Sequence, residues 1–498
     1  MIAAKPLIGR IWRALDAHPA RSVLIVGALV TLALVNVRLF AGGGPWWRGW
    51  ADQKAYLESA RAFLALDLDP ARHWYPLLYP LTGAPFAGIL AAPFVPANIA
   101  CFALAFLGFR KVCARLGVSG AGAVLLWLAA ALLDPRIARL WVEPWTTTLS
   151  AALIWLSLGM VADHLAGDRP TPRRAALLGA LLAAIPLARP TDLAVAAIIA
   201  PFALWRLPLR AFITLAGAAL AVFAAYLALH LAIYGARWSD YVLLSREYGL
   251  NFADLPWKAY VLLVDPQPWF PGETGLLREM PWLLFGAAGL ILGGFRLRGP
   301  ARALWLCLAA AALAYCVILF AYVDLLPSGM WRFNNIHYFK WLLPLFALAS
   351  LLLIRWAHEM PRCTAAVLAA LVLLSCVRPQ AVLVGPAEPA RALRFAAPAV
   401  PWAELYMARS GILDARGAWR NYFDYHQIPD GQETFVAVAL KGRFAGEEMW
   451  MPSGVNDWPL SGAPGRTPHF ADPYPRRPVE RWGTRVVFGG PCWIVRCG

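Results

Sequence analysis

The sequence predicts an all-α polytopic membrane protein of about 11 transmembrane helices, followed by a small C-terminal α+β domain. The chain has 498 residues, of which 60% are hydrophobic and only 15% are charged. Such a composition is typical of a protein whose solvent is the bilayer. The apolar residues gather in stretches long enough to cross a membrane, and this pattern ends after Val377, where Pro, Trp, Gly and charged residues take over.

Each stretch approaches the roughly 20 apolar residues that a spanning helix needs. In order they are Val23 to Phe40, Pro85 to Leu107, Val118 to Leu133, Thr146 to Ala162, Ala175 to Leu187, Asp192 to Trp205, Ala211 to Ile233, Pro281 to Phe295, Ala303 to Tyr322, Tyr338 to Ile354 and Thr364 to Val377. The fifth and sixth are short and are joined by Arg189-Pro190, so they are either two thin spans or one re-entrant pair. The first is expected to remain as an anchor, because no clean cleavage site follows it.

Basic residues mark alternate connections and so predict the orientation of the chain. They are Lys5, Arg10, Arg13 and Arg21 at the N-terminus, then Arg110, Lys111 and Arg115, then Arg169, Arg173 and Arg174, then Arg206 and Arg210, then Arg296, Arg298 and Arg302, and finally Arg355 and Arg362. We therefore expect a multi-pass protein of the cell (inner or plasma) membrane with a cytoplasmic N-terminus and an extracytoplasmic C-terminus. The net charge of +16 then reflects topology and contact with membrane lipid, not nucleic-acid binding.

This orientation places the larger connections, residues 41–84 and 234–280, on the exterior face of a transmembrane domain that covers residues 1–377. Residues 378–498 form the exterior domain. In this domain Trp402 to Leu413 is typical of a helix, whereas Thr434 to Leu440 and Thr484 to Phe488 are typical of strands. Within the 234–280 connection, Trp238 to Tyr248 has the spacing of an interfacial helix that lies on the membrane.

Cysteine spacing favours a disulfide over a metal site. Cys492 and Cys497 lie close together in the predicted exterior tail, and an oxidising compartment favours their pairing; the alternative is two free thiols. The other six cysteines lie in or beside predicted spans, where Cys behaves as a small apolar residue. No Gly-rich phosphate loop, Cys/His metal spacing or Gly-x-Ser-x-Gly elbow occurs, so the sequence supports neither nucleotide-driven nor serine-nucleophile chemistry.

Asp52 is the first candidate for chemistry. It follows the interfacial Trp46, Trp47 and Trp50, so its carboxylate is expected near headgroup depth, where desolvation favours a general base. The alternative is an N-cap, because a helical pattern begins directly after it and Asp is a preferred cap residue.

The residues around Asp52 resemble the first exterior loop of the GT-C integral-membrane glycosyltransferases. The resemblance rests on Asp52-x-x-x-Tyr56-x-x-x-Ala60-Arg61-x-Phe63-Leu64 and Tyr75-Pro76-Leu-Leu-Tyr79-Pro80-Leu81, and it extends to Val142-Glu143-Pro144, Ala188-Arg189-Pro190-Thr191 and His337-Tyr338-Phe339-Lys340-Trp341-Leu-Leu-Pro344. It covers roughly Val23 to Ile354 and does not reach the tail. The resemblance implies an enzyme that moves a sugar from a polyprenyl-phosphate carrier to a glycan, lipid or protein acceptor on the extracytoplasmic face.

The resemblance also implies roles for individual residues. Asp52 is the expected base. Arg189, Arg332, His337 and Lys340 are candidates to bind the donor phosphate, for which the alternative is snorkelling at span ends. Glu143 is a candidate partner of Arg189 or ligand of the acceptor, and its alternative is a helix N-terminus. The remaining candidates for the sugar or acceptor pocket are Tyr56, His73, Tyr75 and Tyr79, with an aromatic belt as the alternative.

One departure concerns cofactors. The family often carries a second acid beside the first, and here Gln53 takes that place. A single carboxylate is a poor site for a hard divalent cation, so the sequence does not support a metal, although it leaves one open. Two other classes of function stay as alternatives. A lipid or solute transporter or flippase would be expected to show paired inverted repeats. In a non-enzymatic envelope-assembly scaffold, Asp52 would be dispensable.

Overall fold

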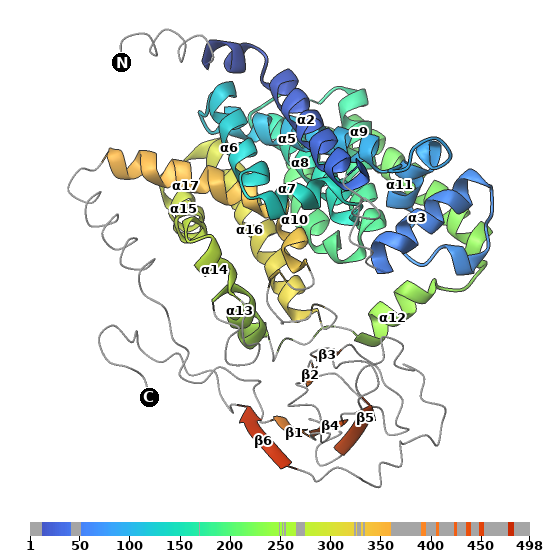
Figure 1. Cartoon of the computed structure of the whole chain (residues 1–498). Helices are drawn as coiled ribbons and strands as arrows, with labels where there is room; N and C mark the ends of the chain where they lie inside the picture. Colours follow the sequence, from blue (N-terminus) through green and yellow to red (C-terminus); the bar gives the residue numbers. More distant parts are fainter. Residues whose placement is uncertain are drawn as a thin grey trace, which may run out of the picture. The chain divides into compact units, whose positions relative to one another are not determined.

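The structure is a computed structural model of the full chain, drawn in Figure 1. It describes residues 12–40 and 51–359, apart from residues 169, 249, 251, 253–254, 265–273, 323–324, 326–329 and 332–333, together with the backbone of six short strands in the C-terminal part. The chain forms two compact units. The first comprises Met1–Val242, Trp282–Tyr315 and Ile336–Thr364, and the second comprises Leu243–Pro281, Cys316–Asn335 and Ala365–Gly498.

The described elements are helical up to residue 359. They are α2 (Pro19–Phe40), α3 (Ala51–Leu64), η1 (Pro70–Arg72), α4 (Leu78–Gly83), η2 (Ala84–Phe86), α5 (Val95–Arg115), α6 (Gly120–Leu132), α7 (Pro135–Val142), α8 (Thr146–Leu165), α9 (Pro172–Ala188), η3 (Pro190–Asp192), α10 (Leu193–Leu204), α11 (Leu209–Tyr234), α12 (Asp240–Tyr248), α13 (Leu255–Leu263), α14 (Leu276–Glu279), α15 (Trp282–Arg296), α16 (Gly299–Ala321), η4 (Asn335–Phe339) and α17 (Leu342–His358).

Several helices begin where the local sequence supplies a cap. Ser119, Asp134 and Thr171 precede α6, α7 and α9, and the side chain of each accepts a hydrogen bond from a backbone N–H of the first turn. Pro at the first helical position of α7 and α9 costs no hydrogen bond, because that N–H has no intrahelical partner. At its other end α11 stops at Gly235, whose φ of 63° suits glycine.

The apolar helices identify a membrane-embedded protein, but the predicted count of about 11 spans is not confirmed. In the part of the chain that the structure describes, four helices are long and apolar enough to cross a membrane: α5, α8, α11 and α16. The bent pair α6 and α7 would make a fifth. Shorter apolar helices occupy four further predicted stretches, and the last stretch, Thr364 to Val377, lies outside the described residues.

One predicted helix start is wrong because of prolines, and the helix that ends as predicted near Leu133 is followed by an unpredicted bend. The stretch predicted from Pro85 becomes the short η2 and a break, and α5 begins only at Val95 with Pro96 in its first turn. The stretch predicted from Val118 ends as α6 at Leu132, and α7 then leaves at an angle of 91°. Between them Asp134 adopts an extended backbone before Pro135, as a residue preceding proline favours.

The first unit is built on closely packed helix pairs. In Figure 1, α5 and α8 lie side by side, with α2 and α6 against α5 and with α9 against α8. Gly108 of α5 makes the close approach possible, because a Cβ at this position would lie 1.9 Å from the carbonyl oxygen of Trp155 in α8. The helices α9 and α11 form a second such pair, and α15 and α17 form a third.

Helix α3 is held against this framework by its apolar face. Tyr56, Leu57 and Ala60 are buried in one cluster with Val35 of α2 and Val142 of α7. A helix of 14 residues with little intrinsic hydrophobicity depends on such packing. The packing fixes the position of its N-terminal turn, which carries Asp52.

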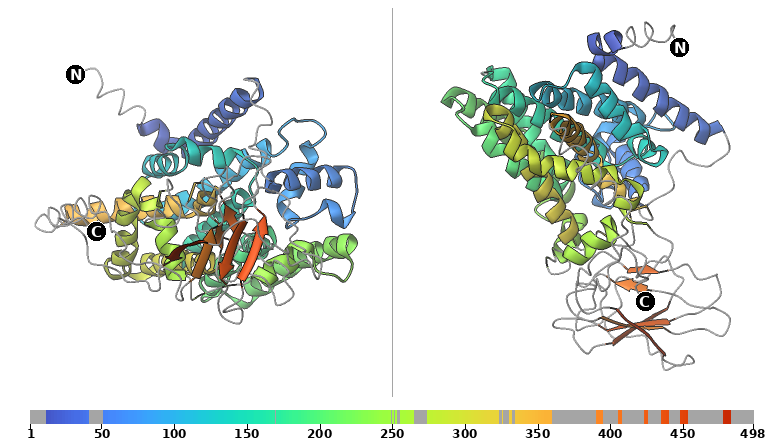
Figure 2. Two further views of the ribbon diagram at one scale, coloured as in Figure 1. Left: turned by 60° about the horizontal axis from the view of Figure 1, so that its bottom comes forward. Right: turned by 90° about the vertical axis from the view of Figure 1, so that its left-hand side faces the viewer.

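The described strands belong to the second unit. Strands β1 (Ala390–Arg394), β4 (Phe435–Ala439), β5 (Glu448–Pro452) and β6 (Arg477–Trp482) form an antiparallel sheet in the order β5-β4-β1-β6, and Figure 2 shows them side by side. A separate antiparallel pair joins β2 (Leu405–Met407) and β3 (Phe423–Tyr425). Strand β4 falls within the strand predicted from Thr434, whereas β2 falls within the helix predicted from Trp402. The strand predicted from Thr484 lies outside the described residues, and the α+β character of this part stays a prediction.

Candidate active site

Asp52 lies in the first turn of α3, where the positive end of the helix dipole favours a carboxylate. Because α3 begins at Ala51, Asp52 is the second residue of the helix, and the N-cap alternative is wrong. Its Oδ1 accepts a hydrogen bond of 2.6 Å from the hydroxyl of Tyr75. Burial raises the pKa of the Asp52 carboxyl, and the Tyr75 hydrogen bond acts in the opposite direction. The result is a carboxylate that binds a proton more readily than an exposed aspartate does.

Four tyrosines cluster near this carboxylate. The ring of Tyr56 lies 4.8 Å from that of Tyr75 and 5.5 Å from that of Tyr79, measured between centroids. Tyr75 also lies 5.2 Å from Tyr241 of α12. Tyr79 is fully buried, and its hydroxyl donates to Asn98 Oδ1 at 2.9 Å. Tyr56 and Tyr79 are therefore buried inside the protein. An aromatic belt at the membrane–water boundary does not describe these two residues.

His73 holds the loop between α3 and α4. Its Nδ1 lies 2.8 Å from the hydroxyl of Ser59, and its Nε2 lies 2.9 Å from the carbonyl oxygen of Asp67. Its ring packs on Phe63, and its backbone carbonyl accepts a hydrogen bond from the Tyr234 hydroxyl. With both ring nitrogens engaged by the protein, His73 orients the segment that carries Tyr75; a part in the substrate pocket stays a prediction.

Glu143 closes α7 and faces α3. It is the C-cap residue of α7 with an extended backbone, not the first residue of a helix. Its Oε2 accepts hydrogen bonds from Gln53 Nε2 at 3.2 Å and from Trp145 Nε1 at 3.4 Å, while Arg139 lies 3.4 Å from Oε1. Gln53 is completely buried, and its amide serves as a neutral donor to the carboxylate of Glu143 at the end of another helix.

Arg189 is buried with 6% of its surface exposed, so the snorkelling alternative does not describe it. It follows the last residue of α9 in an extended conformation. Its Nη1 donates to the hydroxyl of Tyr315 at 2.7 Å and to Asp192 Oδ1 at 3.3 Å, and its guanidinium lies 4.3 Å from the ring centroid of Tyr338. The ion-pair partner of Arg189 is thus Asp192 and not Glu143. The turn of η3 places Asp192, three residues later in the chain, next to the guanidinium.

The late motif places His337 in η4 and Lys340 directly after it. The His337 ring stacks on Trp145 at 4.2 Å, and its Nδ1 lies 3.1 Å from Thr147 Oγ1. Lys340 is 1% exposed, and its Nζ donates to Thr148 Oγ1 at 2.7 Å.

Burial has different consequences for these two bases. It lowers the pKa of His337, and the charges of Lys340 and Arg189 lower it further. A lowered pKa favours the neutral form of the His337 imidazole, and a part of His337 in binding the donor phosphate stays a prediction. Burial also lowers the pKa of Lys340, but the carboxylate of Glu143 raises it, so the charged form of Lys340 depends on that acid.

These groups act on one another electrostatically within the first unit. Tyr56 interacts with Asp52 and with Tyr338, Arg189 interacts with Tyr338 and Tyr241, and His337 interacts with Arg189 and Lys340. Lys340 interacts in turn with Glu143. The structure therefore brings together the candidates from the first loop, from the two middle motifs and from the late motif, which lie up to about 290 residues apart in the chain.

Three predicted residues lie outside the described part of the chain: Arg332, Cys492 and Cys497. Other residues of the cluster were not predicted as site residues, among them Asp192, Tyr241 and Tyr315, and Tyr338 was noted only as part of its motif. A signal for Asp192 existed, since an acid three residues after an arginine is a local ion-pair pattern. Tyr315 gave no such signal, because a tyrosine inside an apolar stretch is usual in a spanning helix.

Comparison with known proteins adds little to this geometry. No protein-family model matches the chain, and no curated protein matches it. A solved structure that it resembles is the archaeal oligosaccharyltransferase AglB from Archaeoglobus fulgidus, in complex with an inhibitory peptide and a dolichol-phosphate. The two chains are 14% identical with a TM-score of 0.40, over 72% of this chain and 52% of that one. This chain thus spans about half the length of AglB.

Proposed function

We propose that this chain is a membrane glycosyltransferase of the GT-C type, which moves a sugar from a polyprenyl-phosphate carrier to an acceptor on the extracytoplasmic face. The observation that carries the proposal is a chain of contacts that joins the candidate segments. Gln53, next to Asp52, bonds Glu143, and Trp145 beside Glu143 stacks on His337. Arg189 lies against Tyr338, and Lys340 bonds Thr148 at the start of α8. A carboxylate base near buried basic groups meets the two needs of such a transfer. The acceptor hydroxyl must lose a proton, and the departing phosphate must find positive charge.

Asp52 is the proposed base. A carboxylate whose pKa is raised by burial removes a proton from a hydroxyl more readily than an exposed one. The Tyr75 hydroxyl binds Oδ1, and Oδ2 is the oxygen proposed to take the proton of the acceptor. With Asp52 as the proposed base and no residue assigned as a nucleophile, we propose direct displacement with inversion at the anomeric carbon.

Arg189 is the proposed principal ligand of the donor phosphate. Its guanidinium keeps its charge at any physiological pH and offers donors in a fork that matches phosphate oxygens. In the contacts described, Asp192 and Tyr315 both accept hydrogen bonds from Nη1 of Arg189. These two hydrogen bonds hold the guanidinium in place. Lys340 is the secondary ligand. It lies beside the N-terminal turn of α8, where backbone N–H groups also favour an anion, and a bound phosphate would favour its charged form as Glu143 does.

A metal step is not part of the proposal. Among the described residues, no group of three or more His, Cys, Asp and Glu side chains is arranged to hold a metal ion. At the place where the family often has two acids, Gln53 and Glu143 offer an amide and a carboxylate joined by a hydrogen bond. Such a pair suits orientation of a polar acceptor better than binding of a hard cation.

A transporter remains the second candidate because of one observation. The 91° bend between α6 and α7 is a broken apolar helix, and broken helices line the substrate sites of many transporters. The bend is followed by Glu143, so it also serves to bring that acid to α3. The two functions differ in chemistry, since only the enzyme cleaves its lipid-linked substrate.

The decisive experiment is a transfer assay with the full chain in proteoliposomes. Radiolabelled sugars on polyprenyl phosphate are supplied as a panel of donors, with an envelope extract as the source of acceptors. We expect at least one donor to release polyprenyl phosphate and to label an acceptor. Movement of intact donor across the vesicle membrane without cleavage would favour the transporter, and neither event with any donor of the panel would contradict the enzyme.

The Tyr75 hydrogen bond predicts a change in pH dependence. Transfer requires the Asp52 carboxylate in its charged form, so the rate should rise with pH through the pKa of Asp52. Tyr75 stabilises the charged form, so Tyr75→Phe raises this pKa and moves the acidic limb of the rate profile to higher pH, with the rate on the plateau largely retained. Tyr226→Phe is the matched control, because the Tyr226 hydroxyl bonds the backbone of Leu77 and not Asp52. An unchanged limb in Tyr75→Phe would contradict the assignment of Asp52 as the titrating base.

A further inference from the structure

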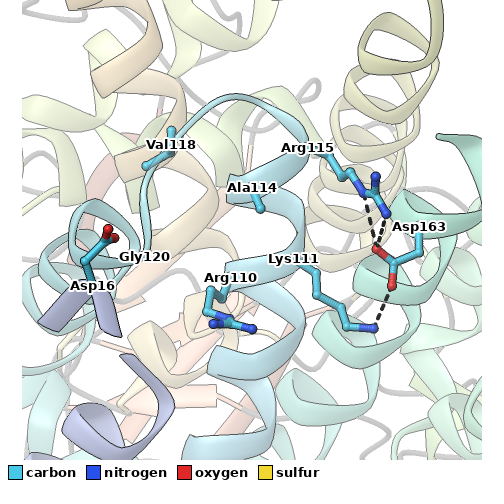
Figure 3. A pocket seen from close by; sticks show the side chains of 8 residues that line it. All are labelled: Asp16, Arg110, Lys111, Ala114, Arg115, Val118, Gly120 and Asp163. Carbon is cyan, nitrogen blue, oxygen red and sulfur yellow. Dashed lines mark hydrogen bonds and ion pairs between the residues drawn. The ribbon is translucent and has the colours of Figure 1, made fainter. Parts of the chain in front are cut away.

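A second site lies at the opposite end of α8 from the candidate active site. Thr148 stands in the first turn of α8 and Asp163 in its last turn. At 1.5 Å per residue the two are about 22 Å apart along the helix. Around Asp163 a cavity of about 360 Å³ is lined by Arg110, Lys111, Arg115, Asp163 and Asp16, with Ala114, Val118 and Gly120 completing its wall (Figure 3).

Among the residues that line this cavity, one arginine lacks a described partner. Lys111 Nζ lies 2.7 Å from Asp163 Oδ2, and Arg115 Nη2 lies 3.0 Å from Oδ1 of the same carboxylate, as the dashed lines of Figure 3 show. Asp16 Oδ1 accepts a hydrogen bond from a backbone N–H of α6. Arg110 is half-buried and has no hydrogen bond or ion pair with any described residue. Three cations thus line the cavity with two carboxylates, and the excess charge belongs to Arg110.

An apolar cavity adjoins the charged one. It measures about 260 Å³ and shares Arg110, Lys111 and Asp163 with its neighbour. It is also lined by Arg174 and Asp168. Asp168 forms an ion pair with Arg115, so the two cavities together still have more basic than acidic side chains. The other lining residues come from α5, α8, α9, α10 and α11 and are mainly aliphatic, among them Leu107, Leu156, Met160, Leu178 and Leu215. An arginine beside an aliphatic cavity suits a ligand with an anionic head and a hydrocarbon tail.

The position of the two cavities favours a lipid over a soluble ligand. Both lie at the ends of α5 and α8, which are long and apolar enough to span a membrane, and lipid phosphates are found at that depth. The same loops carry the basic residues that predict the cytoplasmic face. A soluble phosphate compound would gain nothing from the aliphatic wall.

We propose that Arg110 and the adjoining aliphatic cavity bind one anionic glycerophospholipid of the leaflet opposite to the candidate active site. The phosphate of the lipid contacts the Arg110 guanidinium, with Lys111 and Arg115 held beside it by Asp163. One acyl chain enters the cavity between α5, α8 and α9. This binding is independent of glycosyl transfer and involves no bond formation or cleavage.

Lipid binding by the purified full-length chain tests the proposal. Dioleoylphosphatidylglycerol is titrated into protein in mild detergent, and bound lipid is counted by native mass spectrometry. Arg110→Ala should weaken the apparent affinity by about fivefold, as expected from the loss of one direct hydrogen-bonded contact with the lipid phosphate. Arg110→Lys should recover most of it. The matched control is Arg210→Ala, which removes an exposed arginine that lines neither cavity. It should change the affinity by less than about twofold, because an exposed charge without a direct contact contributes little.

Three outcomes would overturn the proposal. Equal losses in Arg110→Ala and Arg210→Ala would mean general surface attraction. Displacement of the lipid by glycerol phosphate at a similar concentration would mean a site for a soluble anion. Equal binding of dioleoylphosphatidylcholine, unaffected by Arg110→Ala, would mean a merely apolar contact. If Arg110→Ala does not yield folded protein, Arg110→Gln keeps part of the side-chain stem and should show the same loss.

Discussion

Asp52→Asn should lower the rate of glycosyl transfer by at least about 100-fold, which is the lower range for loss of a general base. The substitution keeps the size of the side chain, and the carbonyl oxygen of the introduced amide can still accept the hydrogen bond that Tyr75 donates to Asp52. It also removes a charge whose burial raises the pKa of the carboxyl, so it should not destabilise the fold. A large loss of rate at unchanged stability is therefore the expected signature.

The measurement compares initial rates in proteoliposomes with thermal unfolding in detergent. Glu58→Gln is the matched control, because Glu58 lies on the same helix, keeps 43% of its side-chain surface exposed and pairs only with Lys54 in the contacts described. It should keep its rate within about twofold, as expected for a surface ion pair. Normal transfer by Asp52→Asn would remove the base from the proposal and would favour the scaffold, for which Asp52 is dispensable.

Arg189→Gln should both unfold more easily and lose transfer. It leaves the carboxylate of Asp192 buried beside Ser150 without its cation, and breaking a buried ion pair in this way costs about 3–5 kcal/mol. It also removes the proposed phosphate ligand. The single variant cannot separate the two effects, because an unstable enzyme is inactive for either reason.

The double variant Arg189→Gln/Asp192→Asn separates them. It removes both charges, so we expect most of the lost stability to return while transfer stays at least about 100-fold below wild type. The single variant Asp192→Asn completes the double-mutant cycle. Stability is measured by thermal unfolding of the purified protein, and transfer by the release of polyprenyl phosphate. Recovery of transfer together with stability in the double variant would show that Arg189 has only a structural role.

The boundaries of the helices follow the local sequence wherever a local signal exists. For several helices the predicted ends lie within about four residues of those in the structure: α8, the pair α9 and α10, α11, and α15. Their ends could be predicted because apolar length and capping residues are local features of the sequence. The start of α5 was missed, because the apolar run from Pro85 continues through prolines and hydrophobicity alone hides the break. The end of α6 was predicted within one residue, but the helix α7 that follows the bend was not predicted.

The candidate site shows the same division at the level of side chains. Local residue type was enough to place Asp52 beside a tyrosine loop and to mark Arg189 as a charge that needs a partner inside apolar surroundings. The partner itself, Asp192, depends on the turn of η3, and the link between Gln53 and Glu143 joins residues 90 positions apart. Such pairings depend on how α3, α7 and α8 pack, which no local pattern encodes. Composition and periodicity therefore explain the membrane helices, whereas the meeting of a carboxylate, two buried basic groups and a tyrosine cluster results only from the packing of helices whose sequences are independent of one another.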